Sequence, residues 1–144
     1  MKLEEVETSF PRATEAKVVK YTKPTMKKAK SIVMLARSDV MMAAVQVVAE
    51  GGETNMHSHA GMDGLWFVLG GRARFYGKDN VLLGEFGKHE GVFIPRDVPY
   101  WFESASDEPL EILQAEAICK DVPNIRTDYA PRAAVTNDFE MIKS

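Results

Sequence analysis

Two histidines one residue apart, His57 and His59, form the pattern with the clearest chemical meaning in this sequence. In a β-strand, side chains two residues apart point to the same face, with Cα atoms about 6.6 Å apart. Two imidazoles on one face can converge on a metal ion, because neutral imidazole is a common ligand of divalent transition metals. The same pair could also lie on a surface without any role. The surrounding residues must therefore decide between the two interpretations.

The residues that follow the histidines resemble the first motif of the cupin family. There, a glycine and two histidines with this spacing precede a glutamate and a strand that ends in a glycine turn. The matching residues are Val68, Leu69, Gly71, Arg72, Ala73 and Phe75 in the first motif, and Phe93, Ile94, Pro95 and Pro99 in the second. The resemblance covers residues 45–117. It implies an all-β fold, a small antiparallel β-barrel of jelly-roll type, which can enclose one small ligand.

The glutamate that the cupin resemblance implies as a metal ligand is missing from its place. Counting back from Gly71 puts this position on Gly64, whereas counting back from Gly70 puts it on Asp63. The first register keeps the glycine turn intact and is preferred. Asp63 is then a candidate third ligand only if its side chain can reach the histidines.

The second motif also departs from the family pattern, because Tyr100 stands at its histidine position and Ser104 at its asparagine position. The remaining candidate ligands are His57 and His59, with Asp63 as a further possibility. Catalytic metal sites usually supply three protein ligands. We therefore expect at most a weakly bound divalent ion, such as Zn, Mn, Fe or Ni.

These residues support three functional hypotheses. The first is a small-molecule-binding cupin whose pocket contains His57, His59 and Tyr100, with or without the weakly held metal. The second is a metal-free isomerase or epimerase, in which a histidine acts as base and Tyr100 as acid on a carbonyl or sugar substrate, as in some cupin-like enzymes. The third is a metal-dependent oxygenase or cyclase. Tyr100 could equally fill the pocket without a chemical role.

Other residues have both a structural and a functional interpretation. Trp66 and Trp101, with the phenylalanines that follow them, could line a cavity, although aromatic residues on strands more often form the core. Arg72 and Arg74 share a strand face and could hold a carboxylate or phosphate, although a solvated outer face is favoured. Gln46 could be a polar anchor in the cavity.

The elements that must position these residues are short strands. All ten glycines lie between residues 51 and 91, which concentrates turns in the middle of the chain. Around these turns, short segments rich in Val, Ile, Phe, Tyr and Trp are typical of an all-β fold. The expected strands cover residues 17–21, 32–36, 41–48, 65–69, 72–76, 81–83, 92–94, 100–103 and 110–118. No helix longer than a turn or two is expected.

The chain divides into three expected parts. Residues 1–30 form a basic N-terminal arm, with eight basic and four acidic residues, that contains a first strand at 17–21. Residues 31–118 form the cupin barrel, and residues 119–144 form an irregular tail packed on it. Because the β-prone arm would leave an unpaired edge, and because cupin barrels commonly pair, we expect a homodimer.

Composition excludes several classes of function. The formal net charge of −3 argues against a nucleic-acid-binding protein. The first ten residues carry three glutamates, and the apolar runs, such as residues 40–45, are too short to span a bilayer. Cys119 is the single cysteine, so an intrachain disulfide cannot form. These features predict a cytoplasmic protein that acts without a membrane or nucleic acid, on a small molecule.

Overall fold

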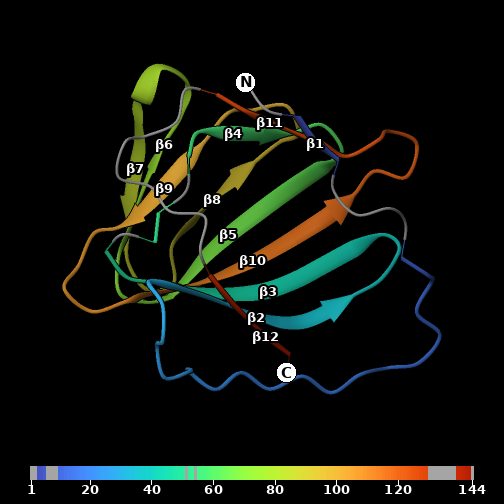
Figure 1. Cartoon of the computed structure of the whole chain (residues 1–144), viewed down its shortest axis with the longest axis horizontal. Helices are drawn as coiled ribbons and strands as arrows, with labels where there is room; N and C mark the ends of the chain where they lie inside the picture. Colours follow the sequence, from blue (N-terminus) through green and yellow to red (C-terminus); the bar gives the residue numbers. More distant parts are fainter. Residues whose placement is uncertain (1–2, 6–9, 51, 54, 130–138, 144) are drawn as a thin grey trace.

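The computed structural model describes residues 3–5, 10–50, 52–53, 55–129 and 139–143. This part of the chain forms β-strands and one short 3-10 turn at Lys78–Asn80, so the all-β prediction is confirmed (Figure 1). The strands are β1 (Leu3–Glu5), β2 (Lys30–Arg37), β3 (Met41–Val48), β4 (His57–His59), β5 (Met62–Gly70), β6 (Ala73–Tyr76), β7 (Leu82–Phe86), β8 (Gly91–Ile94), β9 (Trp101–Ser104), β10 (Leu110–Ile118), β11 (Ile125–Asp128) and β12 (Glu140–Lys143).

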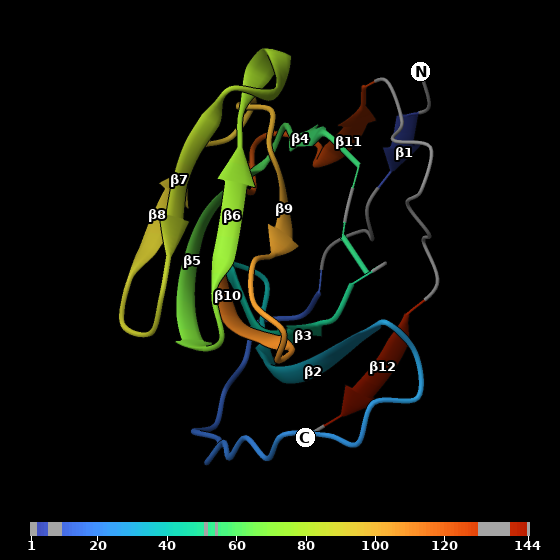
Figure 2. The same ribbon diagram turned by 90° about the vertical axis from the view of Figure 1, so that its left-hand side faces the viewer.

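The strands form two facing layers (Figure 2). One layer is a six-stranded sheet in the order β12-β2-β3-β10-β5-β8. The other contains two three-stranded sheets, β7-β6-β9 and β1-β11-β4, which a bridge between His57 and Tyr100 joins. This is a jelly-roll arrangement, as predicted. The strand pairs of the described residues do not close into a ring, so this jelly roll is an open sandwich of two layers.

Strand β10 shows how the sequence pattern produces the interior. Its buried residues alternate with less buried ones, beginning with Leu110 and Ile112. It pairs on one side with β3 and on the other with β5, so that Ile112 lies between Gln46 and Val68. Because successive side chains point to opposite faces, one row from each strand faces the second layer. The main core between the layers consists of Val48, Trp66, Val68, Ala73, Phe75, Ile94, Tyr100, Phe102, Leu110 and Ile112.

The N-terminal arm differs from its prediction. Residues 17–21 are irregular chain, and the edge of β2 that a strand here could have extended is occupied by β12, which runs parallel to β2. The arm instead packs on the outer face of the large sheet, where Tyr21 and Met26 contact buried valines of β2 and β3. The Tyr21 hydroxyl donates a hydrogen bond to Glu111 over 2.7 Å. The strand of this arm is Leu3–Glu5, which pairs with β11.

The C-terminal segment was expected to be irregular, yet it contributes β11 and β12. In both strands every residue is at least partly exposed, so the apolar alternation that identifies a strand in a sequence is missing. Their positions depend on backbone pairing with β4 and β2 instead. This pairing places residues of the tail next to the histidines.

Within the described residues, no helix is long and apolar enough to cross a membrane.

Candidate ligand-binding cavity

His57, His59 and Tyr100 lie together where the two small sheets join. The His57 amide donates to the Tyr100 carbonyl over 3.0 Å, and the Tyr100 amide donates back to the His57 carbonyl over 2.9 Å. Because His57 and His59 are two residues apart on β4, their rings share one face, with centroids 5.0 Å apart. The Tyr100 ring lies 4.5 Å from the His57 ring and 6.4 Å from the His59 ring. The three side chains therefore form one cluster.

The hydrogen bonding of the histidines fixes the tautomer of one ring. His57 Nδ1 lies 2.7 Å from the carbonyl oxygen of Asn55. A carbonyl oxygen only accepts, so Nδ1 carries the proton and Nε2 of the neutral ring has a free lone pair. His59 Nδ1 is buried and has no hydrogen-bond partner among the described residues. Both rings thus offer nitrogen atoms to a ligand.

Burial and nearby charge hold all three groups in their neutral forms. Burial lowers the pKa of His57 well below its usual value, and the charge of Arg126 lowers it further. The same two causes lower the pKa of His59 to about 4. Burial raises the pKa of the Tyr100 phenol well above its usual value, and the Glu116 carboxylate adds to that shift. At neutral pH, the cluster therefore consists of two uncharged imidazoles and an uncharged phenol.

The cluster forms part of the wall of a cavity of about 810 Å³. This volume suits a small organic molecule. Gln46, which the sequence suggested as an anchor, also faces the cavity and donates a hydrogen bond to Gln114 over 2.9 Å. The remaining lining residues are Phe10, Lys17, Lys30, Ile32, Met34, Leu35, Ala36, Arg37, Met42, Met62, Trp66, Phe102, Gln114, Arg126, Phe139, Met141 and Lys143.

The structure separates the two candidates for the missing glutamate position. Gly64 lies beside a small cavity that His59 and Tyr100 also line, whereas Asp63 points to the other face of β5. The Asp63 carboxylate accepts a hydrogen bond from the Arg96 amide over 2.8 Å. The position that faces the histidines is therefore Gly64, and Asp63 is not brought to them.

A carboxyl group that sequence reasoning missed lies directly beside Gly64. Glu116 on β10 is the register partner of Gly64, is only 3% exposed, and lines the same small cavity. One carboxyl oxygen accepts a hydrogen bond from Gln114, and the other is buried without a partner among the described residues. Burial raises the pKa of Glu116. Its place in an alternating strand gave the only sequence signal, and that pattern could not say which strand lay next to it.

Two arginines that were not predicted from the sequence, Arg37 and Arg126, also line the cavity. Arg126 is the register partner of His59 across the β4–β11 pair, which Figure 1 shows side by side. Arg37 reaches the cavity because of a β-bulge in β2. Met34 pairs with Ala44, but Ala36 pairs with the preceding residue of β3. The extra residue reverses the alternation, so Arg37 lies on the same face as its partner Met42, which also lines the cavity.

The donor atoms do not fit a tightly held divalent cation. Across the described ranges, no three side chains of His, Cys, Asp or Glu lie close enough together to share a metal ion. The positive charge of Arg126, which lowers the pKa of both histidines, would also repel a cation bound between them. Two neutral imidazoles in a positive field can hold a divalent ion only weakly.

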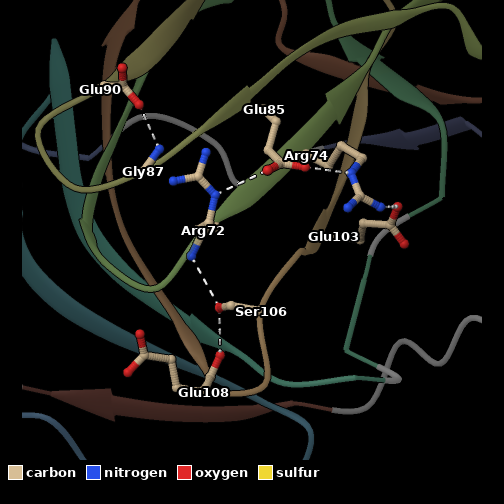
Figure 3. A network of polar contacts seen from close by, with 8 residues as sticks. All are labelled: Arg72, Arg74, Glu85, Gly87, Glu90, Glu103, Ser106 and Glu108. Atoms are coloured by element: carbon tan, nitrogen blue, oxygen red, sulfur yellow. Dashed lines mark hydrogen bonds and ion pairs between the residues drawn. The ribbon is translucent and has the colours of Figure 1, made fainter.

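The arginines of the outer face have different surroundings. Arg72 and Arg74 each donate from Nε to Glu85 over 3.0 Å, and Arg74 also lies 3.5 Å from Glu103 (Figure 3). Each arginine therefore already has a carboxylate partner on the surface. This arrangement agrees with the solvated outer face that the sequence favoured.

Comparison with known proteins gives a consistent picture. The family model described as cupin domain matches residues 44–116. No curated protein matches the chain. A conserved Klebsiella pneumoniae protein with a double-stranded β-helix domain is similar in structure, with a TM-score of 0.65 and 13% identity over 81% of this chain and 99% of that one.

Two further solved structures share the fold. A cupin family protein of Methanocaldococcus jannaschii has a TM-score of 0.61 and 16% identity over 76% of this chain and 96% of that one. A variant of Bacillus subtilis oxalate decarboxylase has a TM-score of 0.50 and 18% identity over 62% of this chain and 24% of that one. At these identities the similarity concerns the fold.

Proposed function

Because this chain belongs to the cupin domain family, we propose that it binds a small molecule in the cavity lined by His57, His59 and Tyr100. One observation carries the proposal, namely that three uncharged hydrogen-bonding rings converge in the wall of a cavity of about 810 Å³. Ligand pockets typically combine an apolar wall with a few convergent polar groups. This cavity has both features.

Each residue of the cluster has a defined part in the proposal. His57 Nε2, left as an acceptor by the bond of Nδ1 to Asn55, receives a hydrogen bond from the ligand. The Tyr100 hydroxyl donates to an acceptor of the ligand. Trp66 lies beside Tyr100 in the aromatic core, and Phe102 lies beside Trp66. Both line the cavity and contact the apolar part of the ligand.

A resident divalent metal is not part of the proposed function. Among the described residues, no third side chain lies close enough to the two imidazoles to complete a metal site with them. We expect Zn, Mn, Fe or Ni to bind weakly, if at all. A metal-dependent oxygenase or cyclase has correspondingly little support.

The isomerase or epimerase hypothesis has one observation in its favour, the fixed tautomer of His57 with a bare Nε2 near the Tyr100 ring. The electrostatics weigh against it. Efficient proton transfer needs a base with a pKa near the working pH. The pKa of His59 is lowered to about 4, and that of Tyr100 is raised, so both groups are poorly matched to neutral pH. Binding is therefore the function proposed here.

The test compares ligand-induced stabilisation in three proteins purified without a metal-affinity tag. Wild type, Tyr100→Phe and Tyr76→Phe are screened by thermal shift against UDP-glucose, α-ketoglutarate, phenylacetate, catechol and the chlorides of zinc and manganese. Tyr76→Phe is the matched control, because the Tyr76 hydroxyl donates to Glu103 outside the cavity. A compound that stabilises wild type should bind Tyr100→Phe about tenfold more weakly, since one hydrogen bond is lost.

The control variant should bind that compound as wild type does. The proposal fails if none of the compounds stabilises wild type. It also fails if Tyr100→Phe and wild type bind each stabilising compound equally. Strong stabilisation by metal ions alone would overturn the metal-free form of the proposal.

A further inference from the structure

The charge of the cavity wall has one sign. No aspartate or glutamate is among the described lining residues of the cavity. Five cationic side chains line it: Lys17, Lys30, Arg37, Arg126 and Lys143. The whole chain has a formal net charge of −3, so this concentration of cations is local. A cleft lined by one sign of charge attracts ligands of the opposite sign.

The cations differ in how far they are already compensated. The Arg126 Nε donates to Asp128 over 3.0 Å, and the charge of Arg37 lowers the pKa of Glu116. Lys30 is different, because no carboxylate of the described residues lies within ion-pair distance of its amine. The Lys30 Nζ lies over the ring of Phe139, 5.9 Å from the ring centroid. An uncompensated and largely desolvated amine in a cavity wall is costly unless an anion accompanies it.

The local electrostatics of Lys30 agree with its geometry. Burial lowers the pKa of its amine to about 8, and the Arg126 guanidinium contributes to this shift. The two cations thus lie close enough to repel each other. An anion between them would relieve both the repulsion and the desolvation.

Most of the wall around these cations is apolar. Ile32, Met34, Met62, Trp66 and Phe102 contribute hydrocarbon or aromatic surface. A fully hydrophilic anion would leave this surface in contact with water. A molecule with an apolar body and one anionic group would satisfy both parts of the wall.

We infer that the ligand of this cavity is an organic carboxylate, whose anionic group pairs with Lys30 and Arg126 and whose apolar body packs against Trp66 and Phe102. This inference rests on the proposed binding function and specifies the chemical class of its ligand. Arg126 suits the role, because Asp128 engages its Nε and a guanidinium has four further N–H donors for a carboxylate.

The test uses pairs of ligands that have the same shape and differ in charge. Phenylacetate, cinnamate and hexanoate are each titrated by calorimetry beside their neutral amides. The proteins are wild type, Lys30→Gln and Lys78→Gln. Lys78 is exposed in the turn after β6, so its replacement removes the same charge away from the cavity. Because no carboxylate of the described residues pairs with the Lys30 amine, Lys30→Gln should fold as wild type does.

At least one carboxylate should bind wild type and Lys78→Gln at least about tenfold more tightly than its amide, as expected for a charge-assisted hydrogen bond. This preference should be smaller in Lys30→Gln, in which Arg126 alone remains to pair with the anion, and it should weaken as salt is added. The inference is overturned if none of the carboxylates binds, or if Lys30→Gln retains the full preference.

The outcomes also separate this inference from the proposed function. Tyr100→Phe could weaken the binding of a neutral compound while the carboxylates bind no more tightly than their amides. In that case the binding function stands and the carboxylate class is wrong. If carboxylates depend on Lys30 but bind Tyr100→Phe as well as wild type, the anion site stands and the proposed role of the Tyr100 cluster is wrong.

Discussion

The chemical state of individual residues in the cavity is set by neighbours from distant parts of the sequence. Gln46 donates to Gln114, and Gln114 donates to Glu116, so a polar chain runs across the inner face of the large sheet. The chain ends at the Glu116 carboxyl group, whose second oxygen has no partner among the described residues. Burying an ionised carboxyl group costs folding free energy, and the contacts with Gln114 and Arg37 do not fully offset this cost. Glu116 therefore opposes stability at neutral pH.

Replacing Glu116 by glutamine should therefore stabilise the protein. The raised pKa means that the folded state keeps the Glu116 proton at pH values where the unfolded state, with its ordinary value of 4.5, has lost it. Wild-type stability contributed by this group is thus fully present below pH 4.5 and is lost as the pH rises towards the folded pKa. Glu116→Gln should gain on the order of 1 kcal/mol at pH 7 and nothing at about pH 4.

Urea unfolding of wild type and variant at both pH values checks this expectation. The matched control is Glu111→Gln on the same strand, whose carboxylate lies on the outer face and pairs with Lys23 and Tyr21. This control should not be stabilised at pH 7. A loss of stability in Glu116→Gln at pH 7 would contradict the argument.

At the residue scale, the sequence could predict only what local spacing determines. The spacing of His57 and His59 places them on one face, and the structure has both rings in the cavity wall with Tyr100, while their chemical roles remain predictions. Glu116 and Arg126 could not be assigned, because their neighbours depend on which strands pair and in which register. Arg37 depends on a bulge, which reverses the alternation without any mark in the sequence.

At the scale of elements, the strands that were predicted are those with two unlike faces. The expected strands at residues 32–36, 41–48, 65–69 and 110–118 all lie within strands of the large sheet. They could be predicted because burial on one face imposes apolar alternation. Strands β11 and β12 carry no such pattern, since their residues are at least partly exposed and their pairing rests on backbone hydrogen bonds.

Strands β5 and β8 approach each other so closely that a glycine is necessary at residue 91, whereas residue 64 can accept a side chain. A Cβ atom on Gly91 would clash with the backbone carbonyl of Trp66, which cannot move without disturbing the sheet. A Cβ on Gly64 would meet the Trp66 indole nitrogen at 3.4 Å, an ordinary contact. We expect Gly91→Ala to lose about 2–4 kcal/mol of unfolding free energy and Gly64→Ala to change it by less than about 0.5 kcal/mol.

Thermal unfolding of the two variants beside wild type distinguishes these positions, since both replacements add the same methyl group to neighbouring strands. Equal melting temperatures for the two variants would show that the β5–β8 contact is looser than described.

At the scale of the whole molecule, the two faces of the large sheet are covered unequally. The inner face bears the core and the cavity, and the N-terminal arm packs on the outer face at β2 and β3. Farther along the outer face, Leu65 on β5 and Phe93 on β8 are register partners and are 46% and 57% exposed. Among the described strands, β8 also forms one edge of this sheet. Adjacent exposed apolar side chains at a sheet edge are typical of an interaction surface.

We therefore expect the protein to be a homodimer that pairs through this outer face. Sedimentation equilibrium at tens of micromolar, an order-of-magnitude choice for a moderate interface, should give twice the chain mass of 16.1 kDa. Phe93→Lys should shift the population to monomer, because it places a charge among apolar side chains that become buried on association.

Val81→Lys is the matched control, since Val81 is 61% exposed but lies in the turn before β7. It should leave the dimer intact. A wild type that sediments as a monomer would contradict the expectation, and equal dissociation by both variants would move the interface away from Leu65 and Phe93.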